Sequence, residues 1–251
     1  MYIITLSHLF FKRYHVSAQK HLNRGMIDLR GDLMYEQLIQ SPDVIELYEK
    51  IQKLETNDTR LKHGMSHVLN VVKNTEIILR QLNAEEDYID AAKISALLHD
   101  IGSVHGYEDH AFHSYVWASE YFRKHNMILP YHTEVLYAIR DHNDFFESIS
   151  LMTLVLILAD KLDITKERLT QSGKETEGIR QLQYIDSIDV SIEDNILHIN
   201  LNTSHDLNIG EMINLNFIQK LRSAIIALSR HQNLTPRLSL NHEILDITLF
   251  K

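Results

Sequence analysis

The sequence predicts a mainly α-helical protein, in which a helical bundle is followed by a small C-terminal α+β appendage. The chain of 251 residues contains only 3 Pro and 8 Gly, so few positions force a turn and long helices are expected. Apolar residues recur at helical spacing from residue 41 to about residue 169, and after residue 171 they alternate in short segments. Hydrophobic residues make up 44% of the chain, which is enough to bury a substantial core.

The first region has the pattern of several amphipathic helices. One helical face carries, in chain order, Val68, Val71, Val72, Thr75, Ile78 and Leu82. This spacing predicts a helix that packs against a core. Further helices are predicted at residues 87–98, 113–125, 133–140 and 150–169, with breaks at Gly102, Gly106, Pro130 and the polar residues 141–144.

The C-terminal region has a different pattern. Two alternating segments, 188–192 and 196–201, flank the turn-forming residues 193–195 and predict a β-hairpin. A helix is predicted at 216–231, and the alternation near Leu238 and at 244–250 predicts one or two more strands. We therefore divide the chain into an N-terminal segment of unassigned role (1–40), a helical domain (41–175) and the appendage (180–251). A lid and a homodimer interface are both open roles for the appendage.

Composition narrows the classes of partner. The formal net charge of -9 argues against binding the phosphate backbone of DNA or RNA, which requires clustered Lys and Arg. The chain has no Cys, so a bound metal must use His and carboxylate ligands. In a signal peptide the basic residues precede the apolar run, but here Lys12 and Arg13 follow the first apolar run. The apolar run at 154–159 is too short to span a bilayer. We expect a cytoplasmic protein without a membrane or nucleic-acid partner.

The doublet His99-Asp100 closes the apolar stretch 94–98, so both side chains lie where a buried helix is predicted to end. At this position a rigid helix would hold two metal ligands. Asp100 could bridge two ions, because its carboxylate has two oxygens. The alternative reading is an Asp that caps the helix beside a packed His. The doublet by itself leaves both readings open.

Asp160 follows the apolar run 154–159, where an unpaired carboxylate costs several kcal/mol to bury. A salt bridge to Lys161 or Arg168 is one form of compensation. Since adjacent helical residues do not face each other, Lys161 is the weaker partner, and we favour a metal. His63 and His67 share a helical face, but no Glu follows His63, so the metalloprotease pattern is absent.

Taken together, five separated segments resemble the HD superfamily of metal-dependent phosphohydrolases. The resemblance covers roughly residues 60–170 and includes all five segments in their family order. They are His67-Val-Leu-Asn-Val-Val72, Leu97-Leu-His-Asp-Ile-Gly102, His110-Ala-Phe-His-Ser114, Ala138-Ile-Arg-Asp-His142 and Leu158-Ala-Asp-Lys-Leu-Asp163.

The resemblance implies a dinuclear metal site. The residues that it assigns to the first ion are His67, His99, Asp100 and Asp160, and those that it assigns to the second are His110 and His142 together with Asp100. Chain order favours His110 over His105 and His113, and His132 lies outside the matching segment. The ions implied are divalent, iron or manganese first, with zinc, nickel or magnesium also accepted. Asp163 lies outside this ligand set, so its loss should be much milder than the loss of Asp100.

One position departs from the family pattern, because many members carry Lys where this chain has Ser103. The cation that neutralises substrate phosphate must then come from elsewhere, and the candidates are Arg140, Lys161, Lys166 and Arg168. The expected catalytic residues are Asp100, Lys161, His63 and His113, of which the two histidines would orient ligands or donate a proton.

The expected function is cleavage of a phosphate ester or phosphoanhydride by a metal-activated water, with a nucleotide as the expected substrate. The segment that ends at His142 looks most like members that cleave dinucleoside polyphosphates, although mononucleotides, cyclic dinucleotides and sugar phosphates also fit. Two alternatives remain. The same six ligands resemble those of di-iron oxygenases of this fold, and a degenerate domain would bind a nucleotide without catalysis. The presence of all six residues argues against the degenerate domain.

Overall fold

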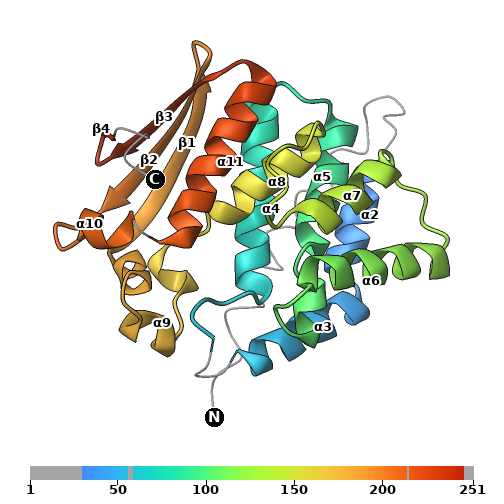
Figure 1. The fold of residues 1–251 in the computed structure, drawn as a ribbon. Helices are drawn as coiled ribbons and strands as arrows, with labels where there is room; N and C mark the ends of the chain where they lie inside the picture. Colours follow the sequence, from blue (N-terminus) through green and yellow to red (C-terminus); the bar gives the residue numbers. More distant parts are fainter. Residues whose placement is uncertain (1–29, 56–58, 214, 246–251) are drawn as a thin grey trace, which may run out of the picture. The chain divides into compact units, whose positions relative to one another are not determined.

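The computed structural model describes residues 30–55, 59–213 and 215–245, in which a helical region is followed by a C-terminal region of strands and helices (Figure 1). This order confirms the predicted fold class. The helical region consists of α2 (Arg30–Ile39), α3 (Pro42–Leu54), α4 (Met65–Gln81), α5 (Glu86–Leu98), η1 (Ile101–His105), α6 (His110–Lys124), α7 (His132–Asp141) and α8 (Leu151–Lys161). None of the helices in the described ranges combines the length and apolar character needed to cross a bilayer.

Two helices at the centre of the bundle carry residues of the predicted site. On α4 the predicted face is buried, including Val68, Val71 and Ile78, and it packs against α5 and α8. On α8 every residue from Met152 to Asp160 is buried, because the helix is apolar all round and contacts α4, α7 and α11. The carboxylate of Asp160 is therefore held by a rigid buried element.

The predicted helix at 150–169 is too long, because α8 ends at Lys161. Beyond this point the main-chain N–H of Asp163 bonds to Asp160 O (3.1 Å). The short turn η2 (Lys166–Arg168) follows, and Lys62 N donates to Arg168 O at 2.9 Å. The backbone after α8 thus pairs with the segment before α4 instead of continuing the helix.

A close contact fixes the start of α6. The main-chain N–H of Gly102, in η1, donates to Ser114 Oγ at 2.9 Å. A Cβ at Gly102 would lie 2.4 Å from both the carbonyl oxygen of His110 and the main-chain nitrogen of Ser114. Only glycine permits this approach, which sets the place of His110 relative to the His99-Asp100 doublet.

The segment that follows η2 contains two short helices that were not predicted, α9 (Gln171–Glu175) and η3 (Ile179–Tyr184). The predicted hairpin is present, because β1 (Ile185–Glu193) pairs antiparallel with β2 (Ile196–Thr203). Asp194 and Asn195 both have positive φ, at 50° and 60°, as a two-residue hairpin turn requires.

The remaining elements complete a four-stranded sheet of order β1-β2-β3-β4. They are α10 (Ile209–Met212), α11 (Asn216–Gln232), β3 (Thr235–Leu240) and β4 (Glu243–Leu245). Strand β3 runs parallel to β2 and β4 runs antiparallel to β3, while α11 packs on β3 and on α8. The predicted strand at 244–250 lies outside the described residues beyond Leu245, and the predicted domain boundaries stay a prediction.

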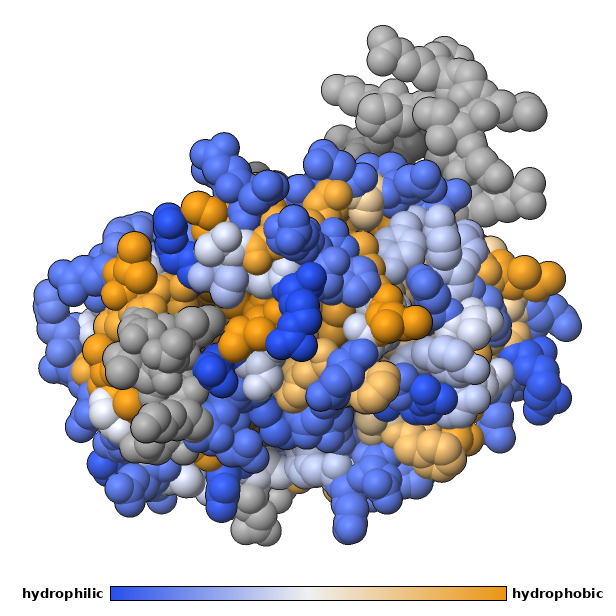
Figure 2. Space-filling view, turned by 45° about the horizontal axis from the view of Figure 1, so that its top comes forward, coloured by the Kyte–Doolittle hydropathy of each residue, from blue (hydrophilic) through white to orange (hydrophobic). Residues whose placement is uncertain are grey.

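The far end of α4 contacts the sheet. Gln81 Nε2 donates to Val190 O at 3.1 Å, and Ile192 N donates to Gln81 Oε1 at 2.6 Å. Helix α4 therefore links the bundle to strand β1. On the face shown in Figure 2, hydrophobic residues lie in several areas separated by hydrophilic ones.

Candidate metal centre

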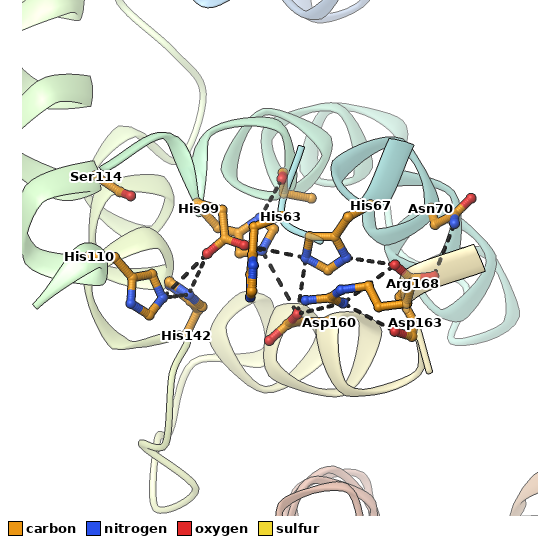
Figure 3. A network of polar contacts seen from close by, with 12 residues as sticks. His63, His67, Asn70, His99, His110, Ser114, His142, Asp160, Asp163 and Arg168 are labelled. Carbon is orange, nitrogen blue, oxygen red and sulfur yellow. Dashed lines mark hydrogen bonds and ion pairs between the residues drawn. The ribbon is translucent and has the colours of Figure 1, made fainter. Parts of the chain in front are cut away.

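The structure brings together the side chains that the resemblance assigned to a metal site (Figure 3). They come from five helices or their ends: α4 (His67), the end of α5 (His99, Asp100), the start of α6 (His110), the end of α7 (His142) and α8 (Asp160). Their role as ligands stays a prediction.

Asp100 lies between two pairs of histidines. Its Oδ2 is 3.4 Å from His67 Nε2 and 3.4 Å from His99 Nε2. Its Oδ1 is 3.3 Å from His110 Nε2 and 3.5 Å from His142 Nε2. Each carboxylate oxygen thus faces one pair, and the two groups that result each have the composition and spacing to hold a metal ion.

Asp160 belongs to the first of these groups. Its Oδ1 lies 3.3 Å from His67 Nε2 and 4.0 Å from His99 Nε2. The first group therefore has two carboxylates and two imidazoles. The second group also has two imidazoles, but its carboxylate is that of Asp100, which it shares with the first group.

Three of the four histidines are oriented by main-chain carbonyls. The Nδ1 atoms of His99, His110 and His142 lie 2.8, 2.8 and 2.7 Å from the carbonyl oxygens of Ala96, Tyr107 and Ile139, each three residues earlier. A carbonyl oxygen only accepts, so Nδ1 carries the proton in each ring. In the neutral ring, Nε2 then presents its lone pair to Asp100.

His67 has a different partner, which sequence reasoning placed outside the ligand set. Its Nδ1 lies 2.7 Å from Asp163 Oδ2, and Asn70 Nδ2 donates to Asp163 Oδ1 at 3.0 Å. Arg168 Nη1 lies 3.4 Å from the same Oδ2 and donates to Asp163 O at 3.1 Å. In the sequence, the signal for this contact was the spacing of these residues. Asp163 follows Asp160 by three residues, and Asn70 follows His67 by three.

The donor set fits a metal ion. The Nε2 atoms of His67 and His99 are buried and form no hydrogen bond, although both lie within ion-pair distance of carboxylates. A buried ring nitrogen without a partner costs free energy, so a ligand to these atoms is expected. Imidazole nitrogens and carboxylate oxygens without sulfur suit iron, manganese and zinc.

The electrostatics of the cluster also call for a cation. Burial alone would raise the pKa of the Asp100 carboxyl. The surrounding histidines lower this pKa by a larger amount, so that it lies well below its usual range. Burial likewise raises the pKa of Asp160, while Lys161 and His67 bring it well below its ordinary value. Burial and Arg168 lower the pKa of His67, and its three carboxylate neighbours outweigh them and raise it to about 10. Without a metal, a proton on His67 balances part of this negative charge.

Lys161 corrects one expectation. Its Nζ donates to Asp160 Oδ2 at 2.5 Å, although adjacent helical residues do not normally face each other. The contact forms because Lys161 is the last residue of α8 and its long side chain can bend back. Lys161 therefore pairs with one oxygen of Asp160, and the other oxygen faces His67.

Two of the other predicted site residues lie beside the cluster. The ring centroid of His63 is 5.8 Å from that of His67 and 4.6 Å from that of Tyr107, and its Nδ1 is 3.5 Å from Glu55 Oε1. Burial lowers the pKa of His63. Arg168 is buried, and its Nη1 lies 3.9 Å from Asp160 Oδ1.

The remaining candidates have other partners. Arg140 Nε pairs with Asp141 at 2.6 Å, and the exposed Lys166 pairs with Asp186 at 2.8 Å. The ring of His113 packs against His105, with centroids 5.3 Å apart. Neither these three side chains nor His132, which packs against Phe122, has a described contact with the six cluster residues.

A groove of about 510 Å³ lies between α3 and α6, and none of the six cluster residues lines it. Its lining residues are Asp43, Glu46, Leu47, Lys50, Trp117, Glu120, Tyr121, Arg123 and Lys124. The site is therefore identified by its side-chain chemistry and not by the size of a cavity.

Residues 64–165 match the family model described as the HD domain, and this range includes all six cluster residues. The chain thus contains an HD domain over these residues, which agrees with the predicted resemblance. The domain and its buried His/Asp groups point to a metal-dependent hydrolase.

One solved structure, described as a predicted HD superfamily hydrolase from an uncultured Thermotogales bacterium, is 24% identical to this chain. The match covers 52% of this chain and 78% of the chain in that structure, with a TM-score of 0.39. Because so little of the two folds superposes, this likeness adds nothing to the family assignment. No curated protein matches the chain.

Proposed function

We propose that this protein is a phosphohydrolase that uses two divalent metal ions, iron or manganese, to cleave a phosphate ester or phosphoanhydride of a nucleotide. One observation carries the proposal: the two oxygens of Asp100 face two separate histidine pairs. A carboxylate in this arrangement suits a pair of ions that share one bridging ligand.

In this proposal the first ion is held by His67, His99, Asp100 and Asp160, and the second by Asp100, His110 and His142. When bound, the ions supply Lewis acidity, which makes water a better nucleophile and stabilises negative charge on phosphoryl oxygens. The chain contributes position, because each histidine ring is fixed through Nδ1 before any ligand arrives. No nucleophilic side chain is required.

The substrate phosphate needs a cation, since the cluster itself carries two carboxylates. Of the four basic candidates, Lys161 and Arg168 lie next to Asp160. The Nε of Arg168 is buried and has no hydrogen-bond partner. Arg140 and Lys166 instead pair with surface carboxylates. We therefore assign the phosphate contact to Lys161 and Arg168.

His63 is the candidate for contact with the leaving group. Its side chain is 21% exposed and its ring lies beside that of His67. Because burial lowers the pKa of His63, the imidazolium form is disfavoured near neutral pH. A hydrogen-bonding role therefore suits His63 better than donation of a full proton.

The test is phosphate release by manganese-loaded protein under nitrogen, with mononucleotides, dinucleoside polyphosphates, cyclic dinucleotides and sugar phosphates as substrates. Hydrolysis takes its oxygen from water, so turnover should not require dioxygen. If none of these compounds is cleaved, while the iron-loaded protein consumes oxygen with an organic substrate, the hydrolase assignment is wrong. Asp100→Asn serves as the inactive control.

A further inference from the structure

The four histidines of the cluster are not equivalent. His99, His110 and His142 each direct Nδ1 to a neutral main-chain carbonyl, whereas His67 directs Nδ1 to the carboxylate of Asp163. A carboxylate behind an imidazole fixes its tautomer and raises its basicity as a metal ligand. His67 should therefore be the strongest nitrogen donor of the four.

Asp163 is itself held in place. Asn70 donates to its Oδ1 and Arg168 lies against its Oδ2, while the side chain is only 6% exposed (Figure 3). These contacts leave the carboxylate little freedom to turn away from His67. The geometry is that of a positioning residue, because Asp163 acts on the cluster through His67.

The two sides of Asp100 also differ in charge and burial. The side with His67 and His99 includes a second carboxylate, that of Asp160, and both rings are at most 1% exposed. Within the described residues, the group on the other side has the carboxylate of Asp100 alone, and the His110 side chain is 14% exposed. A divalent cation gains more from two buried carboxylates than from one.

We propose that Asp163 is a positioning residue that fixes His67 with its proton on Nδ1, so that the position formed by His67, His99, Asp100 and Asp160 binds its metal first and more tightly. The position at His110 and His142 fills second and exchanges more readily. This inference rests on the dinuclear centre of the proposed function, and it concerns metal binding and not turnover.

A purely structural role for Asp163 would give a different result. In that case the carboxylate serves only to pair the buried Arg168 guanidinium, and its loss lowers the free energy of unfolding without altering either metal position selectively. Selective weakening of one binding step separates the two roles.

The experiment is a stepwise Co²⁺ titration of metal-free full-length protein, followed by calorimetry and by the visible absorption of bound cobalt. Wild type should show two steps of unequal affinity. Asp163→Asn keeps the shape of the side chain but removes its charge. It should weaken the first step by about 10- to 100-fold, the usual effect of losing such an outer partner, and shift the absorption of the first cobalt equivalent. The second step should stay unchanged.

Asn70→Ala is the milder variant. Asn70 is exposed, so its truncation should not prevent folding, and it removes one of the contacts that hold Asp163. It should weaken the same first step by a smaller factor. Asp186→Asn, at an exposed carboxylate that pairs with Lys166, is the matched control and should titrate like wild type.

Three outcomes would overturn the inference. They are two equal steps in wild type, an unchanged first step in both Asp163→Asn and Asn70→Ala, and an equal loss at both steps. If Asp163→Asn does not fold, the first step of Asn70→Ala decides. Two unequal steps that respond to Asp163, in a protein that cleaves no phosphate compound, would support this inference while rejecting the proposed function.

Discussion

Gly102 lies so close to His110 that a Cβ on the glycine would be 2.4 Å from the carbonyl oxygen of the histidine. This contact joins the turn after the His99-Asp100 doublet to the first residue of α6. The spacing between Asp100 and His110, which the second metal position requires, thus depends on the absence of a side chain at residue 102.

Gly102→Ala should displace the start of α6, since the opposing atoms belong to the main chain and cannot rotate away. We expect a loss of about 1–3 kcal/mol in the free energy of unfolding, as for other overpacked sites, together with loss of one metal equivalent. Urea unfolding and elemental analysis would measure the two effects. Gly210→Ala is the control, because its Cβ would meet only the Asn208 side chain, at 3.4 Å.

Purified and reconstituted protein should contain two transition-metal ions per chain, because two groups of histidines share Asp100 and Asp160 lies beside the first group. His110→Ala and His142→Ala should each remove one ion and leave a folded chain. Elemental analysis and circular dichroism would test this. A wild-type content of one ion or fewer, after reconstitution with iron or manganese, would exclude the dinuclear centre.

Asp100→Asn should abolish turnover in a protein that still folds. The amide keeps the shape of the side chain but loses the negative charge and the second anionic oxygen, and both histidine pairs depend on that residue. Phosphate release and metal content would be measured together. Activity close to that of wild type would contradict the bridging role, and Asp163→Asn should be clearly milder.

The metal-free protein should lose stability as the pH rises above neutrality. The pKa of His67 is about 10 in the folded chain against an ordinary value of 6.5. A raised folded-state pKa contributes stability that is fully present below pH 6.5 and is lost as the pH rises through about 10. Urea unfolding of metal-free protein over this range should show the decline.

Two comparisons would check the origin of that decline. His67→Asn lacks the titrating ring and should have a flatter profile over the same pH range. Metal-loaded wild type should also be flatter, because a bound cation takes the place of the proton on His67. A metal-free His67→Asn protein with the same decline as wild type would show that another group is responsible.

The sequence predicted the helical fold, the hairpin and the convergence of six side chains, because each rests on periodicity or on an ordered set of motifs. It did not predict the role of Asp163, which meets His67 only after the chain has folded across 96 positions. The carbonyl partners of the other histidines depend on helix ends, which local patterns locate only within a few residues. The short helix α9 was missed because Gly173 has a low helix propensity.

Two predictions at the end of α8 were wrong for the same physical reason. They concern the length of this helix and the contact of Lys161 with Asp160. The pattern of apolar residues continues past Lys161, so the periodicity alone predicted a longer helix. The chain leaves the helix there because the main chain near Arg168 pairs with that near Lys62. Ending the helix also frees the Lys161 side chain to reach Asp160, a contact that the geometry of a continuous helix would disfavour.

The contact between Gln81 and β1 has a consequence for self-association. Strand β1 is an outer strand of the sheet, and such a strand offers unpaired main-chain groups to any second chain that can add to it. The Gln81 side-chain amide binds the main chain of Val190 and Ile192 as a neighbouring strand would. The helix that supplies His67 to the metal centre thereby also blocks part of this edge against fibril-like growth.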